Sequence, residues 1–121
     1  MTADDPIHNT HDGAQVLALA EAQLAALQDD TDTAALLALR TVVRGYPDVC
    51  GDHAGEVVDS LSRLLDNLIV AGRADRLALA VHVRAWRLMV NEEPDALSRA
   101  AMVEGLHAVR DLYAQKAAKA A

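Results

Sequence analysis

The sequence predicts an all-α protein, and three observations support this fold class. Aromatic residues make up only 2% of the chain and phenylalanine is absent, so the core must be packed from Leu, Val and Ala. The chain has only three Pro and six Gly residues, and no stretch alternates β-branched with polar residues. Leu and Ala instead recur at helical spacing along the sequence. We expect an up-and-down four-helix bundle with an additional N-terminal helix.

A chain of 121 residues is the size of one domain. Residues 1–11 are acidic and polar and are expected to form a disordered tail. Residues 12–115 are expected to form a single helical bundle. Residues 116–121, with the sequence KAAKAA, are expected to fray at the C-terminal end.

The first two helices are predicted from capping residues and apolar spacing. Asp12 begins a capping-box pattern, DGAQ, that opens a helix running to about Gln28. A DDTD turn then caps a second helix from Thr33 to about Gly45. Pro47 ends this second helix, because proline disfavours helical geometry at the residue before it.

Three further helices are predicted after Pro47. Asp52 is placed to cap a helix to about Ala71, and Gly72 suits the position just after its end. The Arg73–Val90 segment is the longest apolar run, and its apolar arc is wide enough to need neighbours on several sides. We therefore expect it to be the central helix of the bundle. After an NEEP turn, the last helix presents an apolar face formed by Met102, Leu106, Val109 and Tyr113.

The charge of the chain constrains its partners. A net charge of −7 argues against nucleic-acid binding, because phosphate contacts need a basic face. The Arg73–Val90 segment nevertheless carries four arginines along one side, namely Arg73, Arg76, Arg84 and Arg87. These side chains either pair with acidic residues of neighbouring helices or form a docking edge for an acidic partner.

The cellular location is predicted from three absences. A single cysteine, Cys50, cannot form an intramolecular disulfide, which fits a reducing compartment. The acidic N-terminus is unlike a signal peptide, and no apolar run reaches the roughly 20 residues needed to cross a membrane. We expect a cytoplasmic protein that neither binds nor spans a membrane.

No pattern of residues indicates an enzyme, a metal site or a cofactor. The carboxylates fall on helix faces and caps without a pair spaced for acid–base chemistry, and Cys50 has no basic neighbour that would activate it. His82 lies within the apolar arc of the Arg73–Val90 segment, near Trp86 and Met89. These three residues either line a small-molecule pocket or belong to the core, with the ring nitrogens of His82 hydrogen-bonded inside it.

The second helix carries the most informative surface pattern. Leu37, Arg40, Thr41 and Arg44 project from the side opposite its apolar stripe. A solvent-facing leucine between arginines is mildly unusual, and one such residue alone does not establish a binding surface.

The second helix also resembles the histidine-containing phosphotransfer (HPt) domains of bacterial phosphorelays. The family motif is His-x-Leu-Lys-Gly with a further glycine six positions on, and this chain has Thr41-Val42-Val43-Arg44-Gly45 followed by Gly51. The resemblance covers roughly residues 14–90. Threonine replaces the phosphoacceptor histidine, so the resemblance implies a degenerate HPt-like bundle that does not transfer phosphoryl groups.

The resemblance further implies a role in bacterial two-component or chemotaxis signalling. HPt domains present this face to receiver domains, whose acidic active sites would suit Arg40 and Arg44, with Leu37 as an apolar anchor. We expect a non-catalytic interaction module that docks a receiver domain or a kinase. Two alternatives stay open: a homodimer that self-associates through the last helix, and a small-molecule sensor with a pocket near His82 and Trp86.

Overall fold

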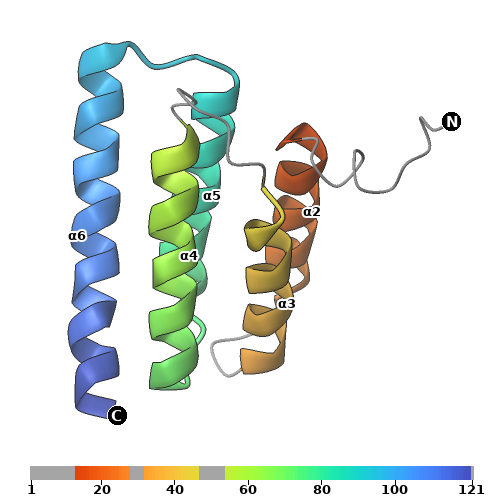
Figure 1. Cartoon of the computed structure of the whole chain (residues 1–121), viewed down its shortest axis with the longest axis vertical. Helices are drawn as coiled ribbons and strands as arrows, with labels where there is room; N and C mark the ends of the chain where they lie inside the picture. The colour runs from red at the N-terminus through yellow and green to blue at the C-terminus, as the bar shows by residue number, and fades with distance from the viewer. Residues whose placement is uncertain (1–12, 28–31, 47–53, 121) are drawn as a thin grey trace, which may run out of the picture.

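The computed structural model describes residues 13–27, 32–46 and 54–120, and all regular structure in these ranges is helical (Figure 1). The helices are α2 (Gly13–Ala26), α3 (Thr33–Arg44), α4 (Ala54–Ala71), α5 (Arg76–Val90) and α6 (Ala96–Ala120). The predicted all-α fold class is confirmed. The predicted tail at residues 1–11, the helix end at Pro47 and the cap at Asp52 lie outside the described residues.

Consecutive helices run in alternating directions, which is the arrangement of an up-and-down bundle (Figure 1). α2 packs on α3, α3 on α4, and α4 on α5, and α5 returns to α2, so these four helices close a ring. α6 lies outside the ring, against α4 and to a smaller extent against α5. The prediction of an additional N-terminal helix is therefore wrong, because α2 buries Val16, Leu17 and Ala20 as a full member of the bundle. The added helix is the C-terminal one.

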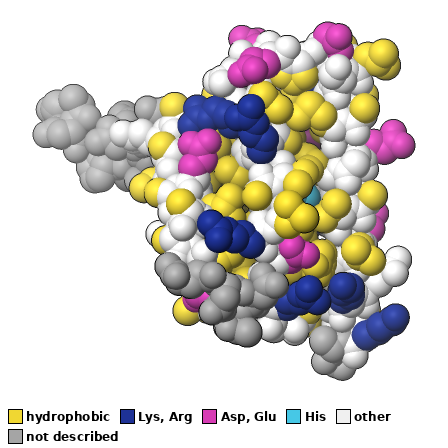
Figure 2. Space-filling model, turned by 180° about the vertical axis from the view of Figure 1, so that it is seen from behind, with side chains coloured by type: hydrophobic (Ala, Val, Ile, Leu, Met, Phe, Trp, Pro, Cys, Tyr) yellow, Lys and Arg dark blue, Asp and Glu magenta, His cyan; other side chains and the backbone are white. Residues whose placement is uncertain are grey.

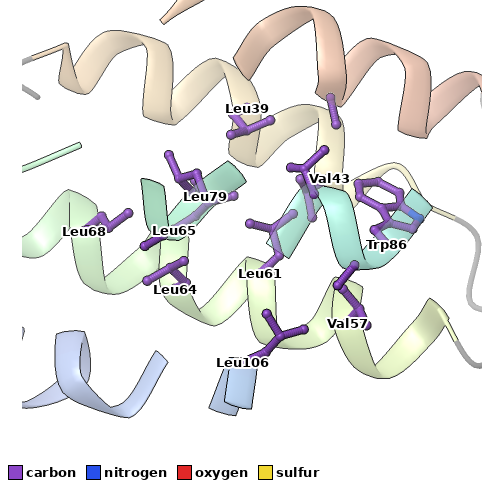
Figure 3. Packing of buried hydrophobic residues seen from close by; sticks show 14 of the residues in the cluster. Leu39, Val43, Val57, Leu61, Leu64, Leu65, Leu68, Leu79, Trp86 and Leu106 are labelled. Carbon is purple, nitrogen blue, oxygen red and sulfur yellow. The ribbon is translucent and has the colours of Figure 1, made fainter. Parts of the chain in front are cut away.

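α4 is the helix around which the core is packed. It contacts α3, α5 and α6, and its leucines are fully buried. Figure 3 shows side chains from the three neighbouring helices converging on α4: Leu39 and Val43 of α3, Leu79 and Trp86 of α5, and Leu106 of α6. The expectation that Arg73–Val90 is the central helix is wrong, because α5 leaves one side in solvent, where Leu77 is 74% exposed and Val81 is 45% exposed.

Aspartates fix where two of the helices begin. The Asp32 carboxylate accepts a hydrogen bond from the amide of Ala35 at 3.2 Å, which confirms the predicted cap of α3. The Asp75 carboxylate accepts a hydrogen bond from the amide of Ala78 at 3.0 Å and caps α5. α5 therefore begins at Arg76, whereas the apolar pattern alone predicts a start at Arg73.

The α4–α5 turn has the predicted glycine geometry. Gly72 has a φ of +69°, and the amide of Arg73 donates to the carbonyl of Leu68 at 3.0 Å. This bond closes a Schellman motif, in which a left-handed residue ends a helix. A side chain at Gly72 would strain this backbone, so glycine is needed at this position.

α6 is longer than the sequence predicts. Asp95 caps its start by accepting a hydrogen bond from the amide of Ser98 at 2.8 Å, and Pro94 precedes this cap. The helix continues to Ala120, beyond the expected bundle boundary at residue 115 and through most of the segment expected to fray. Ala117 is only 7% exposed, so packing supports this last part of the helix.

An ion pair joins α5 to α2 and so helps to close the ring. Arg87 donates from Nε to Oε2 of Glu21 at 3.0 Å and from Nη2 to Oε1 at 2.6 Å. The hydrogen bond from Arg87 is the main reason why the pKa of Glu21 lies below its ordinary value. Both side chains remain partly exposed, so the stabilisation is about 1 kcal/mol or less. Internal pairing of the arginines on this segment is thus confirmed for Arg87.

Candidate functional site

Leu37, Arg40, Thr41 and Arg44 lie on one side of α3, and we refer to these four residues as the α3 face. The opposite side of the helix buries Leu36, Leu39 and Val43 against the bundle, which turns the α3 face outward. Leu37 is 45% exposed, and Thr41 and Arg44 are also exposed. Among the described helices α3 contacts only α2 and α4, so it forms an edge of the bundle (Figure 1).

A carboxylate of α4 holds both arginines of the α3 face. Nη1 of Arg40 lies 3.2 Å from Oδ1 of Asp66, and Nη2 of Arg44 lies 3.3 Å from the same oxygen. Two positive charges thus share one negative charge, and one positive charge remains uncompensated within this group. The sequence pattern of α3 gives no signal for this contact, because Asp66 is distant in sequence and its partners depend on how α4 packs.

The hydroxyl of Thr41 is bonded to the backbone of its own helix. Oγ1 donates to the carbonyl of Leu37 at 3.1 Å, a common arrangement for threonine within a helix. Within the described part of the chain, no other hydrogen bond to Oγ1 is present. Among the described residues, no base accepts a hydrogen bond from Oγ1 of Thr41, as activation of this hydroxyl would require.

The prediction of a small-molecule pocket at His82, Trp86 and Met89 is wrong, because all three side chains are buried in the core. His82 and Trp86 have no exposed surface, and Met89 is 3% exposed. They face inward because α4 covers this side of α5. Met89 does border a small hollow of about 180 Å³ with Glu56 and Arg99, but His82 and Trp86 do not line it.

The interpretation of His82 as a hydrogen-bonded core residue is confirmed. Nδ1 lies 3.0 Å from the carbonyl oxygen of Ala78, which can only accept, so Nδ1 carries the proton. In the neutral ring Nε2 then accepts a hydrogen bond from the hydroxyl of Ser60, 3.0 Å away on α4. The buried polar side chains of Ser60 on α4 and His82 on α5 thus satisfy each other.

Burial lowers the pKa of His82 below its ordinary value of 6.5. The hydrogen bond to Ala78 acts in the opposite direction, whereas His107 and Arg110 of α6 lower the pKa further. The ring is therefore held in its neutral form, in which both of its nitrogens have a partner of the correct type.

This pKa predicts that acid weakens the fold before the carboxylates titrate. Below about pH 6.5 the unfolded chain binds a proton at His82 that the folded chain resists, so the free energy of unfolding falls as the pH decreases. Urea denaturation at several pH values between about 5 and 8 should show this slope in the wild type and a smaller slope in His82→Gln. Equal slopes in the two proteins would contradict a neutral, buried His82.

A groove that the sequence does not predict lies between α5 and α6. It has a volume of about 510 Å³, and its walls and floor are apolar apart from Arg84. The residues that line it are Ala80, Val81, Arg84, Ala85 and Leu88 of α5 and Ala101, Met102, Gly105 and Leu106 of α6. In the sequence, the wide apolar arc of Arg73–Val90 indicates this groove, because α5 has more apolar surface than its neighbouring helices cover.

The expected self-association face of the last helix is used inside the molecule. Leu106 and Tyr113 are each 3% exposed, and Met102 and Val109 pack against the core. The hydroxyl of Tyr113 donates to the carboxylate of Asp75, which ties α6 to the start of α5. Leu106 and Tyr113 are therefore mostly covered within the molecule, whereas Met102 and Val109 keep some exposed surface, and self-association through this face stays a prediction.

Among the described residues, no three or more His, Cys, Asp and Glu side chains come together to hold a metal ion. No helix in the described ranges combines the length and apolarity needed to span a membrane. No family model matches the sequence, and no curated protein or solved structure matches it either.

Proposed function

We propose that this chain is a non-catalytic helical interaction module that binds an acidic protein surface through the α3 face. One observation carries this proposal: an exposed leucine, Leu37, lies on one side of a helix with two guanidinium groups that share a single carboxylate. Apolar anchors next to arginines are typical of the residues that dominate protein interfaces. Both ion pairs with Asp66 are partly exposed, so the guanidinium groups of Arg40 and Arg44 stay accessible to a partner.

The geometry around Thr41 favours binding over catalysis. A threonine hydroxyl is a weak nucleophile unless a base takes its proton, and Oγ1 donates instead to the carbonyl of Leu37. The hydroxyl is exposed, so it is available as a further hydrogen-bonding group for a partner. The α3 face is thus proposed to dock a protein without transferring a phosphoryl group.

The partner that fits the proposal is a receiver domain or a kinase of a bacterial two-component or chemotaxis system. The spacing of Thr41, Gly45 and Gly51 resembles the HPt motif, and the acidic active site of a receiver domain complements Arg40 and Arg44. Carboxylates of the partner would compete with Asp66 for these arginines. Binding through this surface is therefore expected to weaken as the salt concentration rises.

Reversing the charge of the α3 face should remove binding. We expect the double variant Arg40→Glu/Arg44→Glu to bind a cognate receiver domain or kinase at least tenfold more weakly than the wild type, about 1.4 kcal/mol or more. Isothermal titration against a panel of purified receiver domains and kinases would measure this. Lys116→Glu/Lys119→Glu is the matched control, because both lysines are exposed on α6, which does not contact α3 among the described helices.

Asp66→Asn acts in the opposite direction to the charge reversal, because it removes a negative charge from beside the α3 face and leaves both arginines in place. Removing this carboxylate frees Arg40 and Arg44, so affinity for an acidic partner should increase by about two- to fivefold, within the range measured for single surface charges. Equal affinity of the wild type and the Arg40→Glu/Arg44→Glu variant, with both proteins folded by circular dichroism, would remove the α3 face from the binding site.

A further inference from the structure

The groove between α5 and α6 is open along its length. Val81 on one wall is 45% exposed, and Ala101 and Gly105 on the other are exposed as well. A small molecule in such a groove would remain partly in water, whereas pockets for small ligands bury most of the ligand surface. The shape instead suits an elongated ligand that lies along the two helices.

Small residues form much of the groove surface and allow a close approach. A Cβ atom added at Gly105 would meet nothing within 4 Å, so space lies directly above the backbone of α6. Ala80, Ala85 and Ala101 also line the groove. Together these residues leave room for the side chains of a packed helix, as small residues do at close helix–helix contacts.

The apolar surface extends beyond the groove towards the start of α5. Leu77, one turn before Val81, is 74% exposed, and Leu112, two turns after Gly105 on the same side of α6, is 49% exposed. Figure 2, which shows the molecule from behind, has hydrophobic side chains gathered across the middle of this face. An apolar strip of about three helical turns matches the apolar stripe of an amphipathic helix.

Basic side chains lie on the α5 side of this strip and at its end near the start of α5, whereas the acidic Glu104 and Asp111 are exposed on α6. Arg84 lines the groove, and no ion pair joins it, Arg73 or Arg76 to another described residue. Lys116 and Lys119 are exposed near the end of α6, which lies beside the start of α5 because the two helices run in opposite directions (Figure 1). Basic side chains bordering an apolar strip complement acidic side chains bordering the apolar stripe of a partner.

We infer that the groove between α5 and α6 binds an amphipathic helix of a partner protein whose apolar stripe is bordered by Asp and Glu. A second copy of this chain fits less well in a two-fold dimer, because its groove would bring the same positive charges to the interface. The groove is distinct from the α3 face, since no residue of α3 lines it. The inference therefore does not depend on the proposed function.

Two synthetic peptides and two glycine variants test the inference. The peptides share one apolar stripe of about 20 residues in helical spacing and differ only in their borders, which are Glu in one and Lys in the other. Fluorescence anisotropy should show that the Glu peptide binds the wild type at least tenfold more tightly than the Lys peptide. Gly105→Leu should abolish this binding, because its side chain fills the groove without meeting the rest of the fold.

Gly55→Leu is the matched control, because Gly55 also lies in a helix with open space at its Cβ position but does not line the groove. It should bind as the wild type does, and Arg84→Glu should reverse the preference between the peptides. Equal binding of both peptides, binding of neither, or binding unchanged by Gly105→Leu would overturn the inference. A dimer in sedimentation that Gly105→Leu dissociates would also overturn it, because the occupant would then be a second copy.

Discussion

Replacing Trp86 with alanine is expected to lower the free energy of unfolding by about 3–5 kcal/mol. The indole is the largest fully buried side chain, and its loss leaves a cavity among α3, α4 and α5 (Figure 3). Its ring lies 5.1 Å from that of Tyr46, at an interplanar angle of 88°, an edge-to-face contact at the end of α3. Trp86 therefore connects α5 to the helix that carries the α3 face.

Chemical denaturation followed by far-ultraviolet circular dichroism measures this loss, since the variant lacks the tryptophan fluorophore. Leu97→Ala is the control, because Leu97 is 82% exposed and should cost less than about 0.5 kcal/mol. Trp86→Phe should cost only about 1 kcal/mol, because it also removes an Nε1–H that has no hydrogen-bond partner among the described residues. A Trp86→Ala variant as stable as Leu97→Ala would contradict the packing described for the core.

Replacing His82 with leucine is expected to cost about 2–3 kcal/mol, although the two side chains are similar in size. The hydroxyl of Ser60 loses its acceptor, and a buried hydroxyl without a partner carries a desolvation penalty. The double variant Ser60→Ala/His82→Leu removes both polar groups and should recover at least about 1 kcal/mol relative to the sum of the single variants.

The coupling between Ser60 and His82 is measured by chemical denaturation of the wild type, Ser60→Ala, His82→Leu and the double variant. Arg63→Ala serves as a control on α4, since its ion pair with Asp59 is exposed and should contribute little. Additive effects of the two substitutions would show that the hydrogen bond between α4 and α5 is not formed in solution.

The helices were largely predictable from the sequence because their spacing and caps are local properties. Asp32 caps α3 and Gly72 ends α4 as predicted, since each acts on backbone groups within a few residues. The cap at Asp75 was missed because the apolar pattern continues through Arg73 and hides the true start of α5. The position of α6 outside the ring depends on which apolar faces meet, and this is not encoded in any one segment.

The candidate sites show the same division between local and non-local information. The outward direction of Leu37 and Thr41 follows from the helical period of α3 alone, and the structure places both in solvent. The pairing of Arg40 and Arg44 with Asp66 and the partnership of His82 with Ser60 each join residues that are far apart in the sequence. The groove arises because α5 and α6 make limited contact, which only the packed structure reveals.

The central claim is that the α3 face is a docking surface, and chemical-shift mapping by NMR tests it most directly. Titration of the isotope-labelled chain with an unlabelled receiver domain or kinase that binds it should shift the amide signals of residues 37–44 and of Asp66. The side chain of Trp86 should be affected less, because it is buried. Shifts confined to α5 and α6, with residues 37–44 unchanged at saturation, would contradict the proposed function.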